Sequence, residues 1–115
     1  MMTEIAKRLT KEAGITKRLA KDVLADTKEL QCERARLEKM RSENAEEGRL
    51  NIQANVIKDV EASIPANLTR LQKQIKAMEA VIQEAEALPT PPEKELEAAR
   101  EAINLAKETY EANKK

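Results

Sequence analysis

Apolar residues recur along the first part of the chain with the spacing of an α-helix. Every seventh position from residue 9 gives Leu9, Thr16, Val23, Leu30 and Leu37, and Ile5, Leu19 and Met40 fall beside that row. This periodicity predicts an amphipathic helix over residues 4–45. The stretch SENAEEGR then interrupts the pattern, and Gly48 is the expected turn residue.

A second apolar stripe predicts a helix over residues 50–88. Its spacing alternates between four and three, as in a coiled coil, at Ile64, Leu68, Leu71, Ile75, Met78, Ile82 and Ala85. Upstream of Ile64 the apolar residues are instead always four positions apart: Ile52, Val56, Val60 and Ile64. We therefore expect the stripe to drift around the helix in this region.

Pro65 lies inside the second stripe. Proline has no amide hydrogen and its ring crowds the carbonyl of Glu61, which costs a helix interior about 3 kcal/mol. Because the stripe passes Pro65 without losing phase, we expect one helix that is kinked there. The alternative makes Ser63 the N-cap of a separate helix, with Pro65 in its first turn. That alternative needs a break near Ala62, where the sequence has no glycine or loop cluster.

The segment LPTPPEKEL predicts the start of a third helix over residues 91–113. Thr90 is placed as the N-cap, Pro91 as the first helical residue, and Glu93 three residues after the cap, which together form a capping box. The expected seam of this helix alternates small and large residues: Leu96, Ala99, Ile103, Ala106 and Tyr110.

These lengths predict an all-α fold, an elongated antiparallel three-helix bundle that forms a single domain over residues 1–115. At 1.5 Å per residue the two long helices reach about 60 Å and the third about 33 Å. The third helix should therefore end near the level of Leu68 and Leu30, which leaves a two-helix arm beyond Pro65. Leu37, Met40 and Val56 would have one partner helix there, so both a monomer and a homodimer through the arm stay open.

Composition and charge limit the classes of partner that the chain could bind. Charged residues make up 37% of the chain and Tyr110 is the only aromatic residue. The 21 basic and 21 acidic residues cancel, which argues against nucleic-acid or membrane binding. Residues 1–41 nevertheless carry 11 Lys/Arg against 7 Asp/Glu, whereas residues 42–69 carry 2 against 5. The first helix should therefore offer a mildly basic surface.

Few residues are suited to catalysis. Histidine is absent and Cys32 is the only cysteine, which excludes Ser/His and Cys/His pairs and an intramolecular disulfide. No phosphate-binding glycine loop is present, and the acidic pairs Glu46/Glu47 and Glu84/Glu86 lack the ligand spacing of a calcium loop. We expect no enzyme activity, no cofactor and no metal. A reducing, cytoplasmic location is expected, because the sequence shows no signal peptide and no membrane span.

One stripe of basic residues faces away from the predicted seam of the first helix. At 100° per residue, Lys7, Lys11, Arg18 and Lys21 lie roughly opposite Leu9 and Val23. Glu4, Asp22 and Glu29 interrupt the stripe. Two interpretations stay open: a solvated face crossed by salt bridges, and a docking site for an acidic protein.

Three blocks carry a family resemblance. GITKRLAKD at 14–22, LEKMRSE at 37–43 and SIPANLTRL at 63–71 resemble tubulin-specific chaperone A, also called tubulin-folding cofactor A. The resemblance runs from about residue 5 to residue 85. It implies a three-helix cytosolic protein that binds β-tubulin released by the cytosolic chaperonin and holds it without ATP hydrolysis. It also implies that the protein acts before the other tubulin-folding cofactors, which join β-tubulin to α-tubulin.

The same resemblance selects candidate contact residues. The matching blocks fall on Lys17 to Leu19, on Lys39 to Arg41, and on Ile64 and Pro65. Leu19 and Ile64 belong to the apolar seam and Pro65 to the shape of the helix. The candidates for tubulin contact are therefore the charged residues of these blocks: Lys17, Arg18, Lys21, Lys39 and Arg41. The alternative function is a structural adaptor, such as a spectrin-like repeat or coiled-coil module; a helical membrane-surface binder would need a coherent basic face and net charge.

Overall fold

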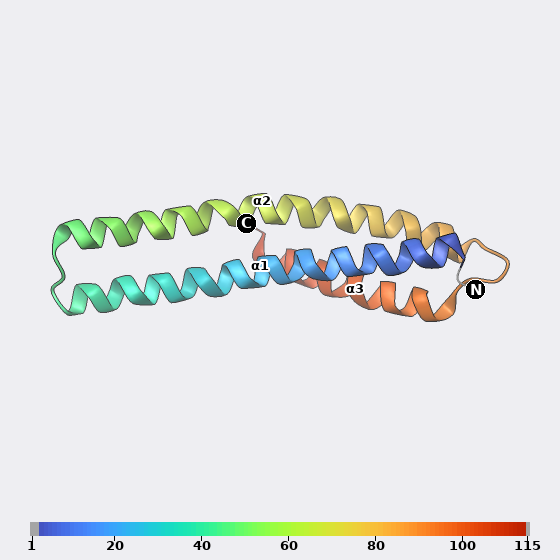
Figure 1. The fold of residues 1–115 in the computed structure, drawn as a ribbon, viewed down its shortest axis with the longest axis horizontal. Coiled ribbons are helices and arrows are strands. Elements are labelled where there is room, and N and C mark those ends of the chain that lie inside the picture. The colour runs from blue at the N-terminus through green and yellow to red at the C-terminus, as the bar shows by residue number, and fades with distance from the viewer. Residues whose placement is uncertain (1–2, 115) are drawn as a thin grey trace.

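Three helices make up the computed structural model, which describes residues 3–114. They are α1 (Glu4–Ser42), α2 (Glu47–Glu86) and α3 (Glu93–Asn113). Figure 1 shows α1 and α2 as a long antiparallel hairpin, with α3 lying along only the half that contains the N-terminus. The molecule measures 67 × 20 × 19 Å. The predicted all-α, elongated three-helix bundle with two long helices and a short third one is confirmed.

Pro65 lies within an unbroken α2. The helix runs from Glu47 to Glu86 with Pro65 inside it, and Figure 1 shows the ribbon bowing gently about its middle. The prediction of one helix through Pro65, rather than two helices joined by a loop, is therefore confirmed. Pro65 is exposed, so its ring needs no space in the core. Its carbonyl accepts a hydrogen bond from Thr69 Oγ1 at 3.0 Å.

The turn between α1 and α2 uses Asn44, and the prediction that Gly48 makes this turn is wrong. α1 ends at Ser42, three residues before the predicted end, and Gly48 lies in the first turn of α2. Asn44 takes a positive φ of 57°, a conformation that asparagine tolerates better than most residues. Its amide donates to the Arg41 carbonyl, and the next amide, that of Ala45, donates to the Met40 carbonyl. This Schellman pattern satisfies the free carbonyls at the end of α1.

The start of α3 also differs from the prediction. Its N-cap is Pro92, the helix begins at Glu93, and no side chain caps it. The predicted capping box of Thr90, Pro91 and Glu93 is therefore wrong. The reason is that a residue before a proline is disfavoured in the helical region. Pro91 precedes Pro92 and so cannot begin the helix.

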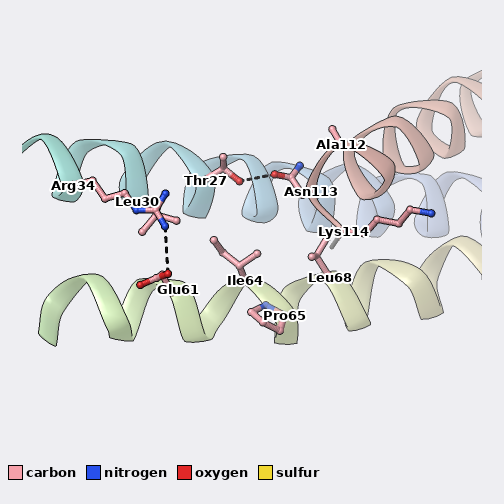
Figure 2. A pocket seen from close by; sticks show the side chains of 10 residues that line it. All are labelled: Thr27, Leu30, Arg34, Glu61, Ile64, Pro65, Leu68, Ala112, Asn113 and Lys114. Atoms are coloured by element: carbon pink, nitrogen blue, oxygen red, sulfur yellow. Dashed lines mark hydrogen bonds and ion pairs between the residues drawn. The ribbon is translucent and has the colours of Figure 1, made fainter. Parts of the chain in front are cut away.

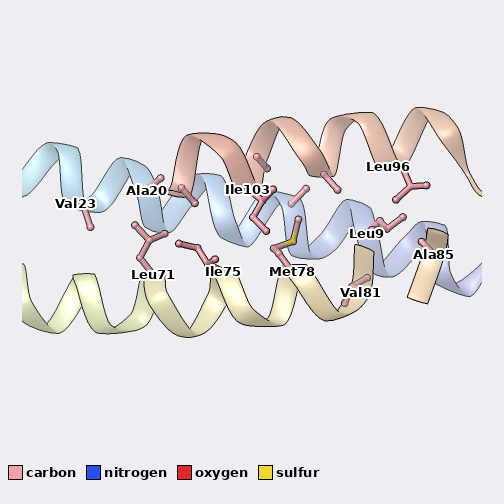
Figure 3. Packing of buried hydrophobic residues seen from close by; sticks show 14 residues of the cluster. Leu9, Ala20, Val23, Leu71, Ile75, Met78, Val81, Ala85, Leu96 and Ile103 are labelled. Carbon is pink, nitrogen blue, oxygen red and sulfur yellow. The ribbon is translucent and has the colours of Figure 1, made fainter. Parts of the chain in front are cut away.

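The main core fills the half of the molecule that contains all three helices. Figure 3 shows large side chains from α1, α2 and α3 meeting there, among them Leu9, Leu71, Met78 and Leu96. The predicted seams of α1 and α3 are confirmed in this region. Small residues stand between the large ones and let the helices approach closely: Ala13, Ala20, Ala85, Ala99, Ala102 and Ala106.

α3 ends where the core gives way to the two-helix arm. Its last residue, Asn113, accepts a hydrogen bond from Thr27 Oγ1 of α1 at 3.0 Å. Leu30 and Leu68 lie beside this end of α3, as its predicted length requires. Beyond it, the core of the arm is a separate small cluster of Leu30, Ile57 and Val60, with Leu37 and Ile64 packed against it.

The apolar stripe of the arm drifts around α2 as its spacing predicts, and the buried seam does not follow it. Ile52 and Val56 are 67% and 36% exposed, whereas Gln53, at 7%, and Ile57 are buried. A spacing of four advances 40° beyond a full turn, so Ile52 lies about 120° from Ile64 on the helix. In the arm α2 has only one partner helix, α1. It therefore buries a narrow seam whose residues are spaced alternately four and three positions apart. Gln53 is tolerated in that seam because its amide donates to Glu33 Oε2 at 2.7 Å.

Hydrogen bonds between α2 side chains and α1 carboxylates recur along the hairpin. Besides the pair of Gln53 and Glu33, the amide of Gln74 donates to Glu12 Oε2 at 2.6 Å. Asp26 accepts from Asn67 and from Ser63. Each pair forms only when the two helices are aligned at one position along their length. We infer that these contacts set the register of α1 against α2, because a shifted register would leave the partly buried groups unpaired.

The arm is expected to be the less stable half of the molecule. Its core cluster has three buried residues, whereas the cluster of the three-helix half has many more. Fewer buried contacts lower the free energy of local opening. Hydrogen exchange measured by NMR should therefore be faster at the amides of Met40 and Val56 than at those of Leu19 and Ile75. Equal protection at the four amides would contradict this prediction.

Candidate binding surfaces

All five predicted contact residues lie on α1 and are exposed: Lys17, Arg18, Lys21, Lys39 and Arg41. The first three stand in the half of α1 that packs against both other helices. Lys39 and Arg41 stand in its last turn, at the far end of the arm. Lys21 and Lys39 are 18 positions apart, or about 27 Å along the helix axis. The candidates therefore form two separate groups.

The second group does not share one face of the helix. Residues two apart project about 200° from each other around an α-helix, so Lys39 and Arg41 point in different directions. Arg41 is also paired with Glu38, its Nη1 lying 3.7 Å from Glu38 Oε2. A single partner surface that contacts Lys17, Arg18 and Lys21 on one side of α1 can also reach Lys39. The structure does not bring Arg41 to that side.

Lys28 also belongs with the first group, although it lies outside the blocks that resemble the family. It is exposed and lies seven residues after Lys21, which places both side chains on the same side of the helix. That spacing was the available signal. We define the basic face as the exposed residues of α1 that gather on this side: Lys7, Lys11, Lys17, Arg18, Lys21 and Lys28.

Most cations of the basic face form no ion pair with the part of the chain that the structure describes. Lys7 Nζ lies 3.7 Å from Glu4 Oε1. Across residues 3–114 no carboxylate oxygen lies within 4.0 Å of the charged nitrogens of Lys11, Lys17, Arg18, Lys21 or Lys28, whereas other α1 cations do form such pairs, for example Arg8 with Glu84 and Arg34 with Glu61. The solvated, salt-bridged interpretation of the stripe thus fits Lys7 and little else of the basic face.

An open cavity of about 480 Å³ lies where α3 ends. Figure 2 shows Leu30, Ile64 and Leu68 directed toward it from α1 and α2, with Asn113 and Lys114 at the end of α3. Among the described residues that line it, three carry groups that ionise: Arg34, Glu61 and Lys114. Arg34 Nη2 and Glu61 Oε2 are 3.3 Å apart. The one hydroxyl in the described lining, that of Thr27, donates a hydrogen bond to Asn113 and has no carboxylate or other base beside it to activate it.

Two surface cations of the three-helix half each form an ion pair with a carboxylate. The pKa of Arg100 is raised because its guanidinium donates a hydrogen bond to Glu86, at 2.8 Å. The pKa of Lys114 is raised for the same reason by Glu111, 2.7 Å away. Both groups are cationic at neutral pH without this help, so the pairs keep their charge and supply no proton transfer.

Neither metal-binding clusters nor membrane spans are found among the described residues. Between residues 3 and 114, no three His, Cys, Asp or Glu side chains gather in a way that would hold a metal ion. None of the three described helices combines the length and the apolar character that crossing a bilayer requires. The single cysteine, Cys32, is exposed and free.

The chain is similar to known proteins both in sequence and in three-dimensional structure. The family model described as Tubulin binding cofactor A matches residues 4–103. Among solved structures, tubulin folding cofactor A from Arabidopsis thaliana superposes with a TM-score of 0.82 at 23% identity, covering 90% of this chain and 96% of that one. No curated protein sequence matches the chain significantly.

A second solved structure has the same fold. It is the recombinant tubulin-binding cofactor A from Leishmania major, with a TM-score of 0.79, 18% identity, and coverage of 94% of this chain and 98% of that one. At such identities the two superpositions establish the three-helix fold. The family model, which spans most of the chain, establishes the family.

Proposed function

The chain belongs to the tubulin binding cofactor A family, and from this premise we propose that it binds and holds β-tubulin during tubulin folding. The proposal is that it receives quasi-native β-tubulin released by the cytosolic chaperonin and keeps it available for assembly with α-tubulin. The observation that carries the proposal is the family match over residues 4–103. In this role the chain works in the cytosol, beside other tubulin-folding cofactors.

The surface of the molecule supports a holding role that uses no ATP. Most of each helix is exposed on one side. The two cations that line the cavity at the end of α3 among the described residues, Arg34 and Lys114, are each paired with a carboxylate, of Glu61 and Glu111 respectively. The sequence has no glycine-rich phosphate loop and no histidine. We therefore propose a protein that is not an enzyme and that engages its partner through helix faces.

The basic face is the contact surface that we propose for tubulin. Lys17, Arg18 and Lys21 come from the blocks that resemble the family, and they are exposed beside other unpaired cations. Opposite charges across an interface guide association and fix orientation, and salt screens them. Binding through this face should therefore weaken as ionic strength rises.

A binding assay with separated tubulin subunits tests the proposal. β-Tubulin released from the chaperonin is mixed with the chain and analysed by size-exclusion chromatography, with released α-tubulin as the control. The expected result is a discrete complex that contains β-tubulin and excludes α-tubulin. If circular dichroism shows a folded helical chain and neither subunit binds, the proposal is wrong and a structural adaptor becomes the better description.

A further inference from the structure

The basic face continues along one side of α1 for several turns. Exposed residues follow each other there at alternating spacings of four and three: Lys7, Lys11, Gly14, Arg18, Lys21, Ala25 and Lys28. This spacing keeps them on one side of the helix over about 30 Å. The row itself contains no acidic residue. The three acidic residues that interrupt the wider stripe lie beside it, each one helical turn from a member of the row: Glu4 from Lys7, Asp22 from Arg18 and Glu29 from Ala25.

Gly14 stands in the middle of this row, and the chain itself gives no reason for a glycine there. It lies inside α1, where glycine is a poorer helix former than alanine. Its φ is not positive, so the backbone conformation is open to any residue. A Cβ built on it would meet nothing within 4 Å. Neither backbone geometry nor packing inside the molecule requires glycine at this position.

Glycine also serves where another backbone must approach closely. At Gly14 the α1 backbone is exposed and carries no side chain. Lys11 lies one helical turn before it and Arg18 one turn after it. A chain that crosses α1 at Gly14 could lie against the helix while its side chains reach these cations. The unpaired cations around it require that such a chain be acidic.

We propose that the basic face binds an acidic segment of the partner protein, and that this segment crosses α1 at Gly14. Its carboxylates pair with Lys11, Arg18 and Lys21, and its main chain lies closest to α1 where the side chain is missing. The proposal rests on the proposed function, since tubulin is the partner whose segment would lie there. It adds the chemistry of that segment and the point of closest approach.

Gly48 provides a matched control for the experiment. It is the other glycine of the chain, is also helical and exposed, and a Cβ on it would likewise meet nothing within 4 Å. It lies in the first turn of α2, at the far end of the arm from the basic face. Gly14→Gln and Gly48→Gln thus make the same change at two exposed helical positions that differ in their distance from the basic face.

The test measures β-tubulin binding and thermal unfolding for the chain and both variants. Both substitutions should raise the melting temperature, because glutamine is the better helix former. Only Gly14→Gln should weaken β-tubulin binding, by about tenfold, because its side chain occupies the place of the approaching segment. A fluorescent glutamate-rich peptide should bind the chain, compete with β-tubulin, and lose affinity with Gly14→Gln alone.

The outcomes separate this proposal from the proposed function. If the chain binds β-tubulin and Gly14→Gln binds it as well as the unmodified chain does, the crossing at Gly14 is wrong while the proposed function stands. If the glutamate-rich peptide binds with the expected variant pattern and β-tubulin does not bind, the proposed function fails and the acidic site stands. Binding of an RNA oligonucleotide or of phosphatidylserine vesicles at this face, with no binding of the peptide, overturns the proposal.

Discussion

Replacing Leu71 by alanine is expected to lower the free energy of unfolding by about 2–5 kcal/mol. Leu71 is 0% exposed, and Figure 3 shows it directed from α2 toward α1 inside the three-helix core. Removing its branched end leaves a cavity that the surrounding helices fill only in part. Proteins of this size are stable by only about 5–15 kcal/mol, so the loss is a large share of the total. Chemical denaturation followed by circular dichroism measures it.

Leu24→Ala is the matched control for this experiment. Leu24 is also on a long helix but is 47% exposed, so the same substitution creates no cavity. Its expected cost is less than about 1 kcal/mol. If both variants lose a comparable free energy of unfolding, Leu71 is not buried in a packed core, and the description of the three-helix core is wrong.

Reversing the charges of Lys17, Arg18 and Lys21 to glutamate is expected to weaken β-tubulin binding by about ten- to a hundredfold. All three side chains are exposed, so the bundle should keep its helicity and its melting behaviour. The physical reason is that attraction across the interface is replaced by repulsion, which slows association and speeds dissociation. Titration with labelled β-tubulin at two salt concentrations measures the effect, and the unmodified chain should show the steeper dependence on salt.

A second triple variant makes the charge experiment specific to the basic face. Lys58, Lys73 and Lys76 are exposed on α2, and reversing them changes the net charge by the same amount. This variant should bind β-tubulin nearly as well as the unmodified chain. If the α1 variant stays helical and binds normally, the basic face is not the tubulin contact. If both variants fail equally, overall charge rather than this face governs binding.

The seams of α1 and α3 could be predicted because helix periodicity is a local property. Leu9, Val23 and Ile103 repeat with the spacing of a helix face, and a helix places such residues on one side wherever it packs. The reach of α3 followed from its number of residues and the fixed rise per residue. Pro65 inside one helix also followed from the sequence, because the apolar stripe kept its phase on both sides of it.

The sequence and the structure differ at places where a neighbouring residue decides the backbone conformation, or where the number of packing helices decides which residues are buried. Thr90 and Pro91 have the composition of a helix start, but Pro92 moves the start to Glu93. Gly48 was expected in the turn between α1 and α2, yet Asn44 takes the left-handed conformation instead. In the arm, Ile52 is apolar and exposed while Gln53 is polar and buried, because one partner helix covers only a narrow seam.

The contact residues show the same division. Their positive charge and their places on the first helix were readable from the sequence, since residue type and helical spacing are local. The place of Lys28 on the basic face is local in the same way, because it follows from the spacing of seven residues to Lys21. Only the packing of α1 against α2 decided which α1 cations are paired across helices, as Arg8 is with Glu84 and Arg34 is with Glu61.

The sequence by itself determined that this protein is an elongated bundle of three helices, since periodicity, length and turn composition act along the chain. Only the tertiary structure decided the register of the hairpin. That register depends on contacts such as those of Gln53 with Glu33 and Gln74 with Glu12. These residues are far apart in the sequence, and a hydrogen bond between them forms only after the helices have packed. Local patterns carry no information about such pairs.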